Sequence, residues 1–110
     1  MNRIEALAKL LGINQEQISS RFIKEDVDSG VANEYYVEEN GESIYYDVLK
    51  EDEIHGRLES MFEAIYSGEE IFEMYGTTNA AEAAEEAHIS LYLSLVGTIG
   101  DYQVYTTEHA

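Results

Sequence analysis

The stretch "NEYYVEENGESIYYDVLK", residues 33–50, has the pattern of a β-hairpin and decides the fold. The dipeptide Asn40-Gly41 separates two runs rich in Tyr, Val and Ile, and it favours the two-residue type I′ turn that joins antiparallel strands. A turn at this point places Glu39 opposite Glu42 and defines the partner of every residue farther from the turn. The other predicted pairs are Val37 with Ile44, Tyr36 with Tyr45, and Tyr35 with Tyr46.

The two faces of this hairpin differ in chemistry, because successive residues of a strand point to opposite sides. We predict that the apolar face belongs to the core; it carries Tyr35, Val37, Ile44, Tyr46 and Val48. The opposite face is aromatic in the middle and acidic around it; it carries Glu34, Tyr36, Glu38, Ser43, Tyr45 and Asp47.

The segments after the hairpin show helical spacing. Residues 51–67 place apolar side chains on one stripe, and Gly68 follows as an expected helix end. A short helix or helical turn should precede Gly76. Residues 79–96 are predicted to be helical as well, with Asn79 and Glu82 spaced as a capping box.

The first segment, "ALAKLLGINQEQISSRF" at residues 6–22, predicts a helical pair with Gly12 between its members. Residues 101–107 predict a strand that joins the hairpin. The sequence therefore predicts one α+β domain over residues 1–110. Its small antiparallel sheet, hairpin 33–49 plus strand 101–107, packs against helices 51–67 and 79–96. We expect these two helices to cover one sheet face and the N-terminal helical pair to pack at an end.

Charge is the most unusual property of the chain. There are 23 acidic residues and 6 basic ones, for a net charge of −17 at pH 7. Residues 1–24 have four bases and two acids, whereas residues 25–110 have two bases and 21 acids. Such a body repels phosphates and anionic lipids and attracts basic surfaces. The apolar stretches are too short to cross a bilayer and nothing resembles a signal peptide, so we expect the protein in the cytoplasm of a host cell.

Catalytic and metal motifs are weak. The chain has no Cys, no Gly-x-Ser-x-Gly elbow and no phosphate-binding loop, so we expect a non-enzymatic protein without a cofactor. The "DVDSG" at residues 26–30 departs from the calcium-loop pattern. Glu85 with His88, and Asp52 with His55, have the spacing of carboxylate di-metal bundles. Further inward carboxylates would be needed, and we expect no metal.

Residues 6–22 resemble the second and third helices of phage-repressor-type DNA-binding domains. Ala8, Gly12 and Ile18 stand at the small, turn and core positions of that pattern. This resemblance implies a transcriptional regulator that binds DNA through a helix-turn-helix at residues 4–22. Phosphate contacts dominate DNA affinity, which makes the acidic body unfavourable for that role. The regulator and a protein–protein adaptor are kept as alternative hypotheses.

The predicted helices arrange their carboxylates in rows. Acidic residues three or four positions apart lie about 5–6 Å apart along a helix axis, which is a phosphate-like spacing. The predicted partner-binding residues on helices are Asp52, Glu59, Glu63, Glu69, Glu70, Glu73, Glu82, Glu85 and Glu86. Those on the hairpin are Glu34, Tyr36, Glu38, Tyr45 and Asp47.

In size, charge and helix-plus-hairpin make-up, the chain resembles the small acidic anti-defence proteins of phages and mobile elements. These include anti-restriction and anti-CRISPR inhibitors, many of which mimic DNA. The resemblance implies a non-enzymatic inhibitor that blocks a basic nucleic-acid-binding surface of a host defence complex, such as a CRISPR effector. The expected partner is thus a basic protein, with no direct contact to nucleic acid or membrane; a second copy of the chain is a further candidate.

Overall fold

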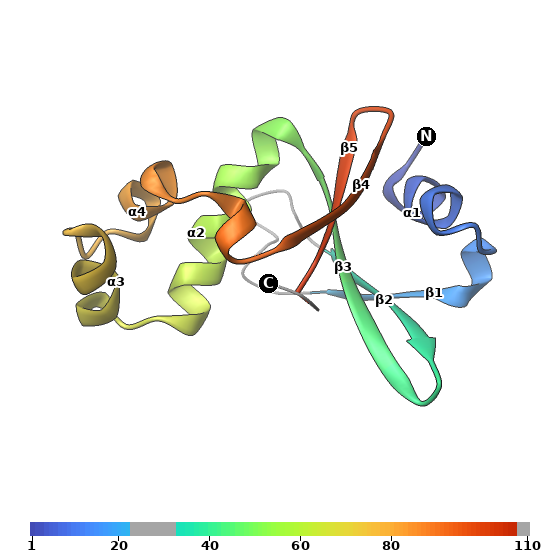
Figure 1. Cartoon of the computed structure of the whole chain (residues 1–110), viewed down its shortest axis with the longest axis horizontal. Coiled ribbons are helices and arrows are strands. Elements are labelled where there is room, and N and C mark those ends of the chain that lie inside the picture. Colours follow the sequence, from blue (N-terminus) through green and yellow to red (C-terminus); the bar gives the residue numbers. More distant parts are fainter. Residues whose placement is uncertain (23–32, 108–110) are drawn as a thin grey trace.

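The structure is a computed structural model that describes residues 1–22 and 33–107, and it is built on a five-stranded antiparallel sheet with strand order β1-β2-β3-β5-β4 (Figure 1). The α+β class predicted from the sequence is confirmed. The strands are β1 (Ile18–Phe22), β2 (Asn33–Glu39), β3 (Glu42–Lys50), β4 (Ser94–Ile99) and β5 (Tyr102–Thr106). The α-helices are α1 (Arg3–Leu11), α2 (Ile54–Ile65), α3 (Gly68–Tyr75) and α4 (Ala80–Glu86). The weak calcium-loop pattern at residues 26–30 lies outside the described residues.

The predicted hairpin is confirmed in its register. Strand β2 pairs with β3 so that Glu39 faces Glu42 and Tyr36 faces Tyr45. Asn40 and Gly41 both have positive φ angles, 52° and 81°, as a type I′ turn requires. The predicted C-terminal strand is also confirmed, because β5 pairs with the second half of β3.

The predicted N-terminal helical pair is only half correct. Helix α1 ends at Gly12, which adopts the left-handed conformation with φ 70°. The second helix is absent: a single 3₁₀ turn, Gln15–Gln17, leads directly into β1, which pairs with β2. Ile18 and the two serines after it have modest helix propensity, and the free edge of β2 gives their backbone groups hydrogen-bonding partners. The helix-turn-helix prediction is therefore wrong.

The predicted helix over residues 79–96 is too long. Helix α4 ends at Glu86, the backbone turns extended at Ala87, and a 3₁₀ turn, Ile89–Leu91, precedes strand β4. Strand β4 contains Val96, Thr98 and Ile99, β-branched residues that favour a strand. Pairing with β5 then determines the outcome.

Gly68 also plays a different part from the one predicted. Helix α2 ends before it, with Tyr66 as the C-cap in an extended conformation. Gly68 is instead the first residue of α3, whose N-cap is Ser67. The Ser67 hydroxyl accepts a hydrogen bond from the Glu70 N–H, and the Glu70 carboxylate accepts one from the Ser67 N–H. This reciprocal capping box begins a new helix where a helix end was expected.

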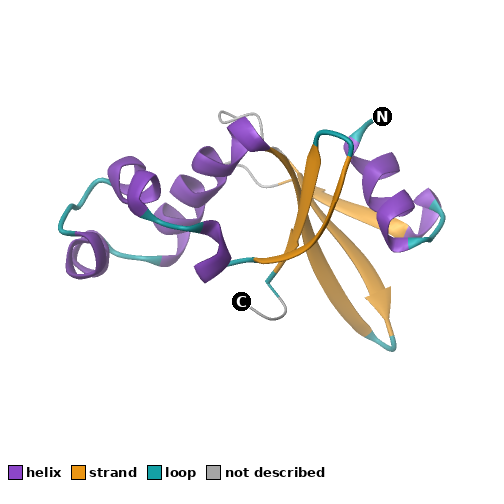
Figure 2. Cartoon of the chain, turned by 45° about the horizontal axis from the view of Figure 1, so that its top comes forward, coloured by secondary structure: helices purple, strands orange, loops and turns teal. Residues whose placement is uncertain are grey.

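Helices lie on both sides of the sheet rather than on one (Figure 2). Helix α1 covers the face that was predicted to be the core side, where Ala6 and Leu7 pack against Tyr35, Val48 and Val104. The expected packing of the long helices on one sheet face is confirmed for α2, whose Met61 contacts Leu49 and Tyr105. The N-terminal segment covers the other face instead of packing at an end. The physical cause is that both faces of β3 are apolar near the end of the strand, so each needs a cover.

Helices α2, α3 and α4 form a helical unit with a core of its own. Leu58 and Phe62 of α2 pack against Ile71 of α3 and against the small residues Ala83 and Ala84 of α4. The small side chains of Ala83 and Ala84 let α4 pack closely against α2. Three tyrosines surround the Phe62 ring at centroid distances of 5.1–5.9 Å; they are Tyr66, Tyr75 and Tyr92.

The helical unit meets the second face of the sheet through a mixed junction. Leu49 and Tyr105 of the sheet pack with Met61 of α2 and with Leu93. Beside them, the Nε of Arg57 on α2 donates a hydrogen bond to a carboxylate oxygen of Asp47 on β3 at 2.9 Å. The side chains of Arg57 and Asp47 are only 12 % and 8 % exposed. Asp47, predicted on an exposed acidic surface, is therefore a buried ion-pair partner.

We predict that Asp47→Ala lowers the free energy of unfolding by about 3 kcal/mol, because it removes the carboxylate bound to a largely buried guanidinium. Urea unfolding followed by circular dichroism measures this loss. The double variant Asp47→Ala with Arg57→Leu should recover part of the loss. A single variant no less stable than Glu38→Ala, which changes an exposed acid of β2, contradicts the structural role of the pair.

Candidate partner-binding surface

The helical unit concentrates negative charge. Residues 51–87 include eleven carboxylates and a single base, Arg57, which is occupied in the internal pair with Asp47. Eight of the nine acids predicted on helices are exposed; they are Asp52, Glu63, Glu69, Glu70, Glu73, Glu82, Glu85 and Glu86. The ninth, Glu59, is half-buried. The outer surface of this unit therefore presents carboxylates with no basic side chain of the unit beside them.

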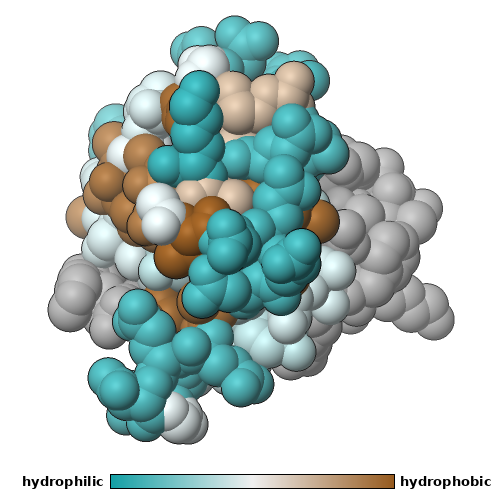
Figure 3. Space-filling model, turned by 90° about the vertical axis from the view of Figure 1, so that its right-hand side faces the viewer, coloured by the Kyte–Doolittle hydropathy of each residue, from teal (hydrophilic) through white to brown (hydrophobic). Residues whose placement is uncertain are grey.

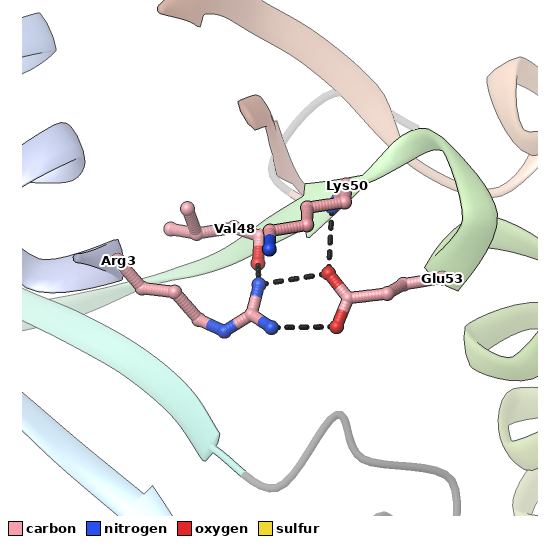
Figure 4. Close-up of polar contacts among 4 residues, drawn as sticks. All are labelled: Arg3, Val48, Lys50 and Glu53. Atoms are coloured by element: carbon pink, nitrogen blue, oxygen red, sulfur yellow. Dashed lines mark hydrogen bonds and ion pairs between the residues drawn. The ribbon is translucent and has the colours of Figure 1, made fainter. Parts of the chain in front are cut away.

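Arg3 and Lys50, two of the basic residues that the structure describes, make their contacts near the sheet. Arg3 forms a two-point contact with Glu53, with nitrogen–oxygen distances of 2.9 and 2.5 Å, and donates a further hydrogen bond to the Val48 carbonyl at 2.8 Å (Figure 4). The Glu53 carboxylate also accepts a hydrogen bond from the Lys50 N–H at 2.7 Å. The charged groups of Arg3 and Lys50 lie 5.4 and 5.8 Å from the centroid of the Tyr102 ring.

Hydrogen bonds in the cluster around Arg3 favour the charged forms of Arg3 and Glu53. Burial by itself would raise the pKa of Glu53, but the hydrogen bonds from Arg3 and from the Lys50 backbone outweigh burial and lower that pKa. Burial likewise opposes the charged form of Arg3, and the hydrogen bond with Glu53 overcomes it, so the pKa of Arg3 is raised. The cluster thus joins α1 to the start of the helical unit.

Helix α3 presents the most distinctive surface of the helical unit. Ile71 is buried and Tyr75 half-buried against the other helices. At 100° per residue, Glu69, Glu70 and Glu73 occupy the middle of the opposite side, and Phe72 and Met74 lie at its two margins. Phe72 is 56 % exposed and Met74 42 % exposed. These two apolar residues were not among the predicted site residues, although their positions outside the Ile71–Tyr75 stripe already indicated exposure.

Two grooves run along the contact between α2 and α4. One groove has a volume of about 520 Å³. Glu59 and Glu63 line one side of it, and the first residues of α4 line the other. There the Asn79 side chain accepts hydrogen bonds from the backbone N–H groups of Ala81 and Glu82. Neither carboxylate is opposed by a base across the groove, since none of its lining residues is basic.

The second groove, of about 500 Å³, brings His55 and His88 together with Glu51 and Glu85. The Nε2–H of His55 donates to the Ala81 carbonyl at 3.0 Å. His88 lies beyond the end of α4, so the helical spacing expected between Glu85 and His88 is not present. Within residues 1–22 and 33–107, no group of three His or carboxylate side chains could hold a metal ion.

Among the predicted hairpin residues, Asp47 contacts Arg57 of α2. The turn that joins β2 and β3 points away from the helical unit (Figure 1). Tyr36 and Tyr45 pack as a tilted pair with centroids 5.4 Å apart, and both are half-buried. Glu38 is exposed, whereas the side chain of Glu34 lies outside the described part of the structure. The end that carries α1 shows polar and apolar residues interspersed (Figure 3). The predicted residues therefore form two separate sets, and the helical set is by far the larger.

Comparison with known proteins found no matching family model, no matching curated protein and no matching solved structure. In the part of the chain that the structure describes, no helix has the length and apolar character needed to span a bilayer. Functional inference therefore rests on the chemistry of the chain's own surfaces.

The Arg3–Glu53 cluster predicts a specific dependence of stability on pH. The pKa of Glu53 in the folded chain lies below its ordinary value of 4.5, so the associated stability is present above that pH and is lost as pH falls through the folded pKa. We expect Glu53→Gln to cost about 1 to 2 kcal/mol near neutral pH, since a hydrogen bond between charged groups is replaced by one to a neutral amide.

Thermal unfolding of the wild type and Glu53→Gln at a series of pH values measures this effect. The difference in Tm between them should shrink below the ordinary pKa of a glutamate. Glu51→Gln is the matched control, because Glu51 lies two residues away in the same 3₁₀ turn and is exposed. This variant should follow the wild type. A Tm difference that stays constant into acid contradicts the lowered pKa of Glu53.

Proposed function

We propose that this protein is a non-enzymatic acidic inhibitor that blocks a basic nucleic-acid-binding surface of a host defence complex by mimicking DNA. The observation that carries the proposal is the charge of the helical unit: eleven carboxylates within residues 51–87, most of them exposed, and one base that is bound internally. Proteins that hold nucleic acid line their channels with Lys and Arg, and the same side chains bind rows of carboxylates.

The position of the bases supports this proposal. Arg3 and Arg57 each bind a carboxylate at the boundary between helices and sheet, where they stabilise the fold. Charge neutralisation therefore takes place in the interior of the molecule, and the outer helical surface keeps its negative potential. A surface of one sign speeds the encounter with an oppositely charged partner and excludes nucleic acid itself.

Helix α3 adds exposed apolar side chains to the acidic surface. Phe72 and Met74 flank its three carboxylates and are both substantially exposed. A partner's nucleic-acid site combines cationic side chains with surfaces on which bases stack, and an exposed aromatic ring can occupy such a surface. In this proposal the carboxylates replace phosphates, and Phe72 acts as an apolar anchor.

The class-level resemblance to phage and mobile-element anti-defence proteins supplies the biological setting of the proposal. An inhibitor of restriction enzymes or CRISPR effectors acts where these complexes meet invading DNA, which places it in the cytoplasm of the host cell. The helix-turn-helix alternative is not pursued, because its second helix is replaced by β1.

Displacement of labelled duplex DNA tests the proposal. Purified CRISPR effectors and restriction enzymes are loaded with their DNA, and the protein is added at increasing concentration. We expect it to displace DNA from its cognate complex. The inhibition should weaken as salt rises, because screening acts on charge pairs at the surface. Displacement that does not change with salt, or none across the panel, contradicts DNA mimicry.

A pair of charge-matched variants identifies the surface. The triple variant Glu63→Gln, Glu73→Gln and Glu86→Gln removes three exposed carboxylates from the helical unit. We expect its affinity for the complex to fall about tenfold, since surface charge pairs contribute up to about 1 kcal/mol each.

The control triple variant Glu16→Gln, Glu39→Gln and Glu42→Gln removes three exposed carboxylates near the sheet, so both variants have the same net charge. The control should keep the wild-type affinity. Equal losses in the two variants would mean that total charge matters and the helical surface does not.

A further inference from the structure

The segment from residue 87 to residue 100 contains no Asp, Glu, Lys or Arg, and it is the longest such stretch in a chain with 29 charged residues. It runs between Glu86 and Asp101 and includes all of β4. Three of its apolar side chains are strongly exposed: Leu91 is 66 %, Leu95 57 % and Val96 42 % exposed. The chain has a net charge of −17, so this uncharged apolar surface contrasts with the acidic surface of the rest of the chain.

Strand β4 is also the last strand of the sheet. Its only strand neighbour is β5, so among the described residues no strand pairs with its outer edge. Exposed edges are normally blocked by Lys, Pro or inward-pointing charge. The sequence of β4, "SLVGTI", has none of these; its only irregularity is the shift in register between Leu95 and Gly97, which makes Val96 an additional residue.

We infer that β4 is a self-association site, at which the strand pairs antiparallel with β4 of a second copy around a two-fold axis. An antiparallel strand pair is self-complementary, as a symmetric dimer interface must be. The short regular run Gly97–Ile99 supplies edge hydrogen bonds, and Leu91, Leu95 and Val96 of both copies supply apolar contact beside it.

Charge identifies a second copy as the occupant. A basic partner is attracted to the acidic helices and gains nothing electrostatic at an uncharged strand. Two copies of this chain repel each other wherever their acidic surfaces meet. At β4 they can approach through a long exposed stretch that has no charged side chains. The remaining charges still oppose dimerisation at a distance, so added salt should strengthen the dimer. This salt dependence is opposite in sign to that of the proposed inhibitor contact, which makes the two proposals separable.

Sedimentation equilibrium over a range of protein concentrations tests the inference. We expect a reversible dimer of twice the chain mass, with a Kd that falls at least several-fold when NaCl rises from about 0.05 to about 0.5 M and the Debye length shortens. Leu95→Asp should give a monomer, because each copy then places a charge at the uncharged edge. The matched control Phe72→Asp makes the same change at an exposed apolar residue of α3 and should remain dimeric.

Two further measurements exclude trivial explanations. The circular dichroism spectrum of Leu95→Asp should match that of the wild type, which shows that the variant folds. Hydrogen exchange should slow in residues 94–99 when the wild type dimerises. A wild type that stays monomeric, a dimer that Leu95→Asp leaves intact, or a dimer without slower exchange in β4 overturns the inference, and none of these results bears on DNA mimicry.

Discussion

The ion pair between Arg57 and Asp47 connects the two halves of the molecule. It joins α2 to β3 at a place where both side chains are almost fully removed from water. Charges at such a place are costly unless they are paired, so the pair specifies how the helical unit meets the sheet. The apolar contact of Leu49, Met61, Leu93 and Tyr105 beside it supplies the burial, and the ion pair adds the orientation.

The same pairing shapes the surface. The chain has six bases, and Arg3 and Arg57 are placed where helices meet the sheet, each bound to a carboxylate. Because these bases are used internally, the helices beyond the junction present acid without compensation. The stability of the fold and the negative potential of its outer surface thus have one origin, which is the location of a few cationic side chains.

The hairpin was predictable because its information is local. Asn40-Gly41 determines the turn, and the turn determines the register of every pair up to Tyr35 with Tyr46. The strand β1 was missed for the opposite reason, because its residues have no strong preference by themselves and become a strand at the unpaired edge of β2. The strand β4 was missed although Val96, Thr98 and Ile99 favour a strand, and pairing with β5 outweighs the helical spacing that precedes it. The exposed Phe72 and the burial of Asp47 likewise depend on packing that no short window contains.

The sequence by itself determined the α+β class, the hairpin and its register, the acidic character of the chain and the existence of helices with exposed carboxylates. These follow from local turn chemistry, hydrophobic period and composition. Only the tertiary structure decided that helices cover both sheet faces, that residues 18–22 and 94–99 are edge strands, and that the acids divide into a large helical set and a small hairpin set. These features arise from long-range backbone pairing and from burial of apolar and ionic groups, which depend on residues far apart in the chain.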